Sequence, residues 1–242
     1  MVTDDETQPE IKAIDGESGA TLVLVAPVAL LEPGGEAGSW RGPAWRDTGS
    51  LIAANVAARG VPARVLGGVG RDPLGDLYRQ WLKAQGVERF ALFRDDSRVT
   101  ALRLAGPAGV TWDGVAGSAA VALDPVTVSD QALAGVRRVV IMASAAAGSA
   151  SNRQAALLAA RLGVGRRAAV WLALDELITP EARSKGGEWL RAVAEQAKRL
   201  VALPGWSGPA ALGGREATGL TEAALVEEIV SDAAGNSGVR RL

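Results

Sequence analysis

Short apolar runs alternate with longer amphipathic segments along most of this chain. Residues 22–25 form a continuous apolar run, as expected of a strand that is covered on both faces. Similar runs, which predict further strands, lie at 62–69, 136–143, 168–174 and 200–203. Because helical patterns separate these runs, the sequence predicts a parallel sheet with right-handed crossovers.

Capping residues mark the ends of the predicted helices. Asp47 and the residues after it offer N-cap chemistry for a helix that Gly60 ends. Pro73 suits the first position of the next helix, and Thr221 caps the last one. The helices are predicted at 51–59, at 74–85, at 152–162 with a stop at Gly163, at 187–199 and at 222–230.

Residues 89–121 follow a different pattern. Polar and apolar residues alternate over 98–104, and Gly106-Pro107 and Asp113-Gly114 mark turns, which is typical of antiparallel strands. We expect a lid or part of a subunit contact in this insertion. The predicted fold is a three-layer α/β domain over residues 20–242, with a mostly parallel sheet and a small antiparallel β lid at about 89–121.

The first 19 residues differ from the rest of the chain. They are polar and acidic, which predicts a disordered leader and does not suit the positively charged front of a signal peptide. The apolar run over 21–31 is shorter than the roughly 20 residues that a bilayer-spanning helix needs. We therefore expect a cytoplasmic protein with no membrane contact, and the absence of cysteine fits that compartment.

Composition excludes several classes of site. The chain has no Cys and no His, which rules out disulfides, Cys/His zinc sites and a Ser-His-Asp triad. Its 26 basic residues nearly balance its 27 acidic residues, whereas a nucleic-acid binder usually carries a basic excess. The arginine pairs 137–138, 166–167 and 240–241 are interpreted as solvated charge at the ends of elements.

One glycine pair has the spacing of a phosphate-binding loop. Gly70 and Gly75 are five residues apart, as in that motif, but the next position is Asp76 where the motif needs Lys. A carboxylate there would repel phosphate. The segment is better explained as a turn from a strand into a helix.

Asp175 is the clearest candidate for a site residue. It follows the strand at 168–174, and ligands of parallel α/β sheets bind at the carboxyl ends of strands. A turn or capping role is equally compatible with its position. Trp40 and Trp45 lie near a loop, where they are expected to anchor the chain or to stack on a ligand. Trp171 is expected in the core.

The segment from Asp47 to Val87 resembles the first signature region of the ribokinase-like (PfkB) carbohydrate kinases. The helix, Gly60, the strand 63–67, the turn 68–75 and a second helix ending at 85–87 occur in the order of that family. Thr100, Asp175 and 218–221 also match positions of the family. The resemblance implies a ribokinase-like fold.

The same resemblance implies that groups used by these kinases are missing. The family's sugar-binding Asp follows the first strand, where this chain has apolar residues and only a displaced Glu32. Its glycine pair falls on Arg46 and Asp47, and its substrate-binding Asn falls on Leu51.

Two further motifs of the family are also missing. The Asn-x-x-Glu motif tied to magnesium and phosphate falls on 205–208, which holds no carboxylate. The Gly-Ala-Gly-Asp motif, which holds the catalytic base, is not in this sequence, because the chain ends at Leu242.

These departures predict a non-catalytic pseudokinase of the PfkB type that acts through binding, with no catalytic residue, no metal site and no cofactor. The substrate-binding candidates are Glu32, Arg46, Asp47 and Asp175. The alternative is an ATP-dependent sugar or nucleoside kinase, with ATP and Mg²⁺ as cofactors, that a segment outside this sequence completes.

Partners follow from the same resemblance. A sheet that lacks its last strands would leave an edge uncovered, which predicts a homo-oligomer or a partner protein on that edge. Dimerisation through the lid and a small-molecule ligand are also expected, whereas nucleic acid and membranes are not.

Overall fold

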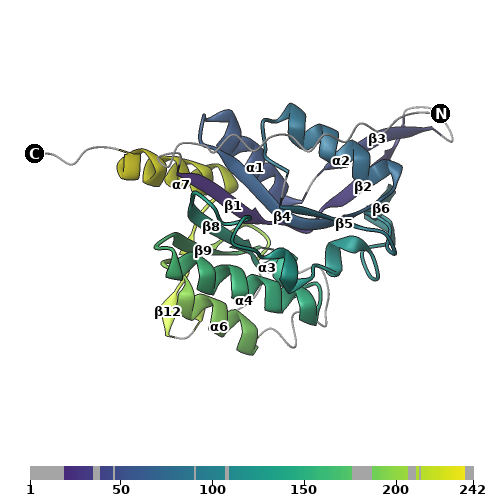
Figure 1. Cartoon of the computed structure of the whole chain (residues 1–242). Helices are drawn as coiled ribbons and strands as arrows, with labels where there is room; N and C mark the ends of the chain where they lie inside the picture. Colours follow the sequence, from purple (N-terminus) through teal and green to yellow (C-terminus); the bar gives the residue numbers. More distant parts are fainter. Residues whose placement is uncertain are drawn as a thin grey trace, which may run out of the picture.

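A parallel sheet covered on both faces by helices forms the centre of the molecule (Figure 1). The computed structural model describes residues 19–34, 39–45, 47–89, 91–106, 109–175, 187–206, 211–212 and 214–237. In this part of the chain the sheet has seven strands in the order β13-β10-β9-β8-β1-β4-β5, and all neighbours are parallel. The strands are β1 (Ala20–Leu24), β4 (Ala63–Gly70), β5 (Leu92–Asp95), β8 (Val136–Met142), β9 (Ala169–Leu174), β10 (Arg199–Ala202) and β13 (Thr218–Gly219).

The strand order changes direction between β1 and β8. From β1 the chain proceeds to β4 and β5 on one side, and later to β8, β9 and β10 on the other. Every residue of β1 and β4 is buried, as the continuous apolar runs predict. The carboxyl ends of β1 and β8 therefore meet at a switch point, which is where open α/β sheets bind ligands.

Helices form the two outer layers (Figure 1). One face carries α1 (Thr48–Ala58), α2 (Pro73–Ala84) and α7 (Glu222–Ser237), and the other carries α3 (Ala143–Ala147), α4 (Ala150–Gly165) and α6 (Gly187–Gln196). The caps at Asp47 and Thr221 and the position of Pro73 are confirmed. None of the helices described is long and apolar enough to cross a membrane.

The stop that we predicted at Gly163 was wrong, because α4 continues to Gly165. A Cβ at Gly163 would lie only 3.1 Å from Val139 Cγ2 and 3.2 Å from Val170 Cγ2. The glycine therefore lets the helix pack closely on β8 and β9, and it does not end the helix.

A separate four-stranded sheet forms the lid over the carboxyl edge of the main sheet. Its order is β3-β2-β6-β7, and β2 pairs parallel with β6 while the other pairs are antiparallel. Its strands are β2 (Val28–Pro33), β3 (Trp40–Trp45), β6 (Ala101–Gly106) and β7 (Gly109–Asp113). The short elements η1 (Ala119–Val121), η2 (Pro125–Thr127), β11 (Ala211–Leu212) and β12 (Arg215–Glu216) complete the described fold.

The three-layer fold with a mostly parallel sheet and a small lid is confirmed, but the lid draws on more of the chain than residues 89–121. Strand β5 lies within that range, yet it joins the parallel sheet next to β4. Strands β2 and β3 come from before α1. The apolar run over 21–31 includes most of β1 and the first part of β2, which are separated by residues 25–27, and Pro27 there cannot donate to a strand ladder.

A hydrogen-bonded joint ties the start of α2 to the lid. Thr100, just before β6, donates from its backbone N–H to Asp72 Oδ2 at 2.6 Å and from its hydroxyl to Asp72 Oδ1 at 2.9 Å. The hydroxyl also accepts from the Gly70 N–H at 3.0 Å. These bonds fix the point where the chain passes from β5 of the main sheet to β6 of the lid.

Gly75 is required by this joint. A Cβ at this position would clash with the carbonyl oxygen of Gly70 and lie 3.0 Å from Thr100 Oγ1. Gly75→Ala should therefore lower the free energy of unfolding by about 1–3 kcal/mol, although Ala favours helices by about 1 kcal/mol over Gly. Urea denaturation measures this effect.

The matched control is Gly235→Ala in α7, where a Cβ would meet no heavy atom within 4 Å. This variant should be neutral or slightly stabilising. Equal stability of the two variants would contradict the crowding at the joint.

Candidate functional site

A cleft of about 540 Å³ lies between the carboxyl edge of the parallel sheet and the lid. The sheet side is formed by residues that follow β1, β8, β9 and β10, together with the first residues of α1 and α7. The lid side comes from β2, β6 and β7. The lining residues are Ala26, Val28, Leu30, Asp47, Thr48, Arg103, Val110, Asp113, Ser144, Asp175, Pro204 and Glu222.

Asp175 lies at the floor of the cleft, directly after β9. It is 4% exposed. Its Oδ1 accepts from the Ser144 backbone N–H at 2.8 Å, and its Oδ2 accepts from the Ser144 hydroxyl. Burial raises the pKa of Asp175 to about 6, although the hydrogen bonds from Ser144 favour the charged form. The carboxyl group can therefore exchange a proton near neutral pH.

Asp47 is the second carboxylate of the cleft, and the residue as a whole is partly exposed. As the N-cap of α1 it accepts from the Ser50 N–H through Oδ1 at 2.8 Å. Its Oδ2 is buried and has no hydrogen-bond partner among the described residues. Burial is the main cause that raises the pKa of Asp47 to about 7, and the charge of Asp175 adds to it, while hydrogen bonds from Ser50 oppose it.

Aromatic packing holds the start of α1 in place. The hydroxyl groups of Ser50 and Tyr78 are hydrogen-bonded at 2.5 Å. Tyr78 is fully buried, and its ring meets Trp45 edge-on at 4.7 Å between centroids. Trp45 is therefore an anchoring residue. Trp171 is 2% exposed in β9, as expected of a core residue.

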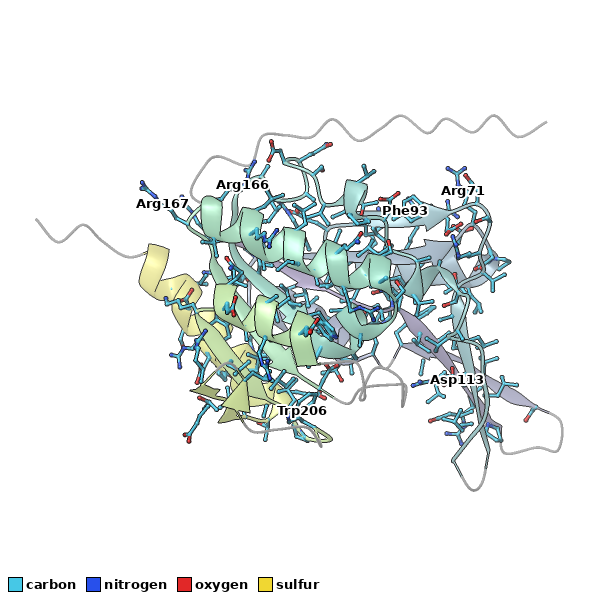
Figure 2. All side chains as sticks on the ribbon, turned by 90° about the horizontal axis from the view of Figure 1, so that it is seen from below. Arg71, Phe93, Asp113, Arg166, Arg167 and Trp206 are labelled. Atoms are coloured by element: carbon cyan, nitrogen blue, oxygen red, sulfur yellow. The ribbon has the colours of Figure 1, made fainter. Side chains whose placement is uncertain are left out.

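The lid contributes an ion pair and apolar side chains. Arg103 donates from Nε to Asp113 Oδ2 at 3.1 Å, and its second nitrogen lies 3.0 Å from the same oxygen. Asp113 lies on the part of the lid that projects from the main domain (Figure 2). Within the described lining, four carboxylates thus face one guanidinium, which one of those carboxylates already engages.

The structure brings together two of the four predicted site residues. Asp47 and Asp175 line the same cleft. Glu32 is not part of the described lining, although Val28 and Leu30 of the same strand are. Arg46 lies outside the described residues.

Several lining residues were not predicted. Ser144 follows β8 as Asp175 follows β9, so the rule of polar residues at carboxyl ends could have found it. Arg103 and Asp113 had no such signal. Neither follows a strand of the parallel sheet, and Asp113 had the pattern of a turn. Thr48, next to Asp47, adds a polar group to the lining three positions before Leu51, where the resemblance implied the loss of the substrate-binding Asn.

The described lining does not fit the triphosphate of a nucleotide. Phosphate groups are recognised by free guanidinium or ammonium groups and by bound cations. Here Arg103 is paired with Asp113, and Asp47, Asp175 and Glu222 add negative charge. Hydroxyl and ammonium groups, which donate hydrogen bonds, match this lining better.

No family model matches the chain, and no curated protein sequence matches it. Solved structures do. A protein assigned as ribokinase II from E. coli, in complex with ATP and Mg²⁺, has a TM-score of 0.64 and 19% identity over 77% of this chain and 62% of its own. The 2-dehydro-3-deoxygluconokinase of Thermotoga maritima has a TM-score of 0.65 and 15% identity, over 76% of this chain and 59% of its own. A PfkB protein from Polaromonas sp. JS666 has a TM-score of 0.62 and 19% identity, over 76% of this chain and 65% of its own.

The chain spans about three-fifths of the length of these structures. At such low identities the likeness concerns the fold. The parallel sheet with its switch point, the two helical layers and the lid sheet all agree with it. The chain has the ribokinase-like fold of the PfkB carbohydrate kinases.

Proposed function

We propose that this chain is a non-catalytic binding protein that holds a small uncharged ligand rich in hydroxyl groups, such as a sugar or a nucleoside, between the sheet edge and the lid. The structural neighbours are sugar and nucleoside kinases, which supports this class of ligand. The acidic lining favours the binding of hydroxyl groups and disfavours phosphoryl transfer, so we propose binding without catalysis.

The unpartnered Oδ2 of Asp47 carries the proposal. A buried acceptor without a donor costs about 1–3 kcal/mol, and a ligand hydroxyl that donates to it would remove that cost. Asp175 lines the same cleft and offers further acceptor capacity beyond its bonds to Ser144. The apolar side chains of Val28, Leu30 and Val110 suit the carbon skeleton of such a ligand.

Charge and sequence support the non-catalytic part. Phosphoryl transfer depends on cations that stabilise the transferred group, whereas the described lining is acidic. The position of the family's substrate-binding Asn holds Leu51, and its magnesium motif falls on 205–208, which has no carboxylate.

Ligand-dependent melting tests the proposal. Sugars, polyols and nucleosides should include compounds that raise the melting temperature of the wild-type protein. Asp175→Asn should weaken their binding by about tenfold or more, the value of a lost charge-assisted hydrogen bond. Asp130→Asn, an exposed carboxylate paired with Arg166, is the control and should change nothing. If no compound of the panel binds, the proposed function is wrong.

One observation favours a kinase as the second candidate. Asp175 has a pKa raised to about 6 by burial, and a carboxylate of that pKa could accept the proton of a bound hydroxyl near neutral pH. Consumption of ATP with the same panel decides between the two. Turnover that Asp175→Asn abolishes would establish the kinase and exclude the non-catalytic function.

Association with a second copy or with a partner protein stays a prediction. Sedimentation of the purified chain measures it: a larger species is expected, and a monomer at all concentrations would contradict it.

A further inference from the structure

A second hollow, of about 500 Å³, lies at the free edge of the parallel sheet. Among the described lining residues, it shares none with the cleft under the lid. Its lining comes from the turn after β4, from α2, from the edge strand β5 and from η2. The residues are Arg71, Arg79, Ala91, Leu92, Phe93, Arg94 and Thr127.

The charge of this hollow is opposite to that of the cleft. Its described lining includes three arginines and no carboxylate. Two carboxylates outside the described lining pair with these arginines: Asp76 Oδ1 lies 2.7 Å from Arg94 and 4.0 Å from Arg79, and Asp96 Oδ1 lies 2.6 Å from Arg71.

Arg94 has binding capacity left. Of its nitrogens, Nη2 bonds to Asp76 Oδ1, while Nε is buried and has no hydrogen-bond partner among the described residues. Its side chain is 24% exposed. A guanidinium presents five donors in a rigid fork that matches the oxygens of a phosphate group, and the single bond to Asp76 does not engage all of them.

An apolar surface lies beside the charges. Phe93 is partly buried against the core, and Ala91 and Leu92 are buried next to it. Figure 2 shows Arg71 and Phe93 at the same end of the molecule, far from Arg166 and Arg167. The hollow thus combines an anion-binding group with a ring on which a planar body can stack.

We infer that this hollow at the β5 edge binds a small organic phosphate: a phosphate monoester whose dianionic group lies among Arg71, Arg79 and Arg94 and whose apolar or planar part contacts Phe93. The size of the hollow is that of a small-molecule site. This site is independent of the ligand proposed for the cleft.

Phenyl phosphate is the probe, because it carries a ring and a dianion, and inorganic phosphate, phenol and citrate are the comparisons. Titration calorimetry should show saturable binding of phenyl phosphate, tighter than that of inorganic phosphate, and none of phenol. Arg94→Gln should weaken binding about tenfold, and Phe93→Ala should remove the advantage of phenyl phosphate over phosphate.

Asp76→Asn tests the site in the opposite direction. It frees the guanidinium groups of Arg94 and Arg79 from a competing carboxylate and should tighten phenyl phosphate binding. Arg166→Gln, which removes an equal charge from an exposed ion pair at the far end of the molecule, should change nothing.

The inference fails if phenyl phosphate shows no saturable binding, if Arg166→Gln weakens binding as much as Arg94→Gln, or if citrate binds more tightly than phenyl phosphate. Binding that survives unchanged in Asp175→Asn separates this site from the cleft.

Discussion

Asp47→Asn should raise the free energy of unfolding at pH 8 by about 2–4 kcal/mol, because each unit of pKa shift corresponds to about 1.36 kcal/mol. The pKa of Asp47 is raised from 3.8 to about 7, mainly by burial. At pH 8 the folded protein must therefore hold a charged carboxylate that it would prefer to protonate. Asn keeps the N-cap of α1, since its side-chain oxygen also accepts from the Ser50 N–H.

The pH dependence follows from the same shift. Between pH 4 and pH 7 the folded state binds more protons than the unfolded state, so the stability of the wild-type protein should fall as the pH rises. Asp175, with a pKa of about 6, acts in the same direction. Burial also tends to raise the pKa of Asp72, but hydrogen bonds from Thr100 and Gly75 lower it overall. Asp72 therefore loses its stabilising effect only below this window.

Urea denaturation at pH 5 and pH 8 measures both effects. The gain in the free energy of unfolding from Asp47→Asn should be smaller at pH 5 than at pH 8. Most of the change in stability between these two pH values should therefore disappear in this variant. Asp130→Asn, whose side chain is 83% exposed, should leave the slope unchanged. A gain that is equal at both pH values would show that Asp47 is charged throughout.

The second large effect concerns Arg138, which is 1% exposed in β8. It donates to Thr21 Oγ1 at 3.1 Å, to Asp232 Oδ2 at 3.4 Å and to the carbonyl oxygen of Gly19. Desolvation lowers its pKa, and Asp232 opposes that effect. Asp232→Ala would leave the buried charge without its carboxylate partner, and we expect a loss of about 3 kcal/mol of stability.

A double variant and a surface pair sharpen this prediction. Arg138→Met combined with Asp232→Ala should be more stable than Asp232→Ala alone, since the unpaired buried charge is then gone. Glu227→Ala on the same helix removes an exposed pair with Arg59 and should cost no more than about 1 kcal/mol. Equal losses for Asp232→Ala and Glu227→Ala would contradict the burial of Arg138.

The prediction that the arginine pairs are solvated was therefore wrong for Arg138. Arg137 is exposed and fits it. Adjacent residues of a strand point to opposite faces, and β8 is a central strand with α7 over one face. The pattern along the chain could not show that α7, almost a hundred residues later, supplies the partner Asp232.

Patterns within short segments predicted the parts of the fold that depend on neighbours in the sequence, namely buried strands and helix caps. Continuous apolar runs marked β1, β4, β8 and β9, and capping residues marked the starts of α1, α2 and α7. The lid was only partly predicted. Its parallel pair of β2 with β6 joins residues some seventy positions apart, and nothing in either strand specifies that partner.

In the candidate site too, residues set by their own segment were predictable, whereas contacts between distant segments were not. Asp175 was predictable because it ends a buried strand, and Asp47 because it caps a helix. The ion pair of Arg103 with Asp113 depends on the lid pairing and had no local signal. Glu32 was chosen by its order in the chain, and it is not part of the described lining.

Titration of the side-chain carboxyl carbons by NMR tests whether Asp47 and Asp175 share one acidic cleft. Two carboxyl signals should titrate near pH 7 and pH 6, and each should vanish in its own Asn variant. In Asp175→Asn the midpoint of Asp47 should fall, because the charge of Asp175 raises the pKa of Asp47. Midpoints near pH 4 for both groups, unchanged by the variants, would show that the two carboxyl groups are neither buried nor coupled in one cleft.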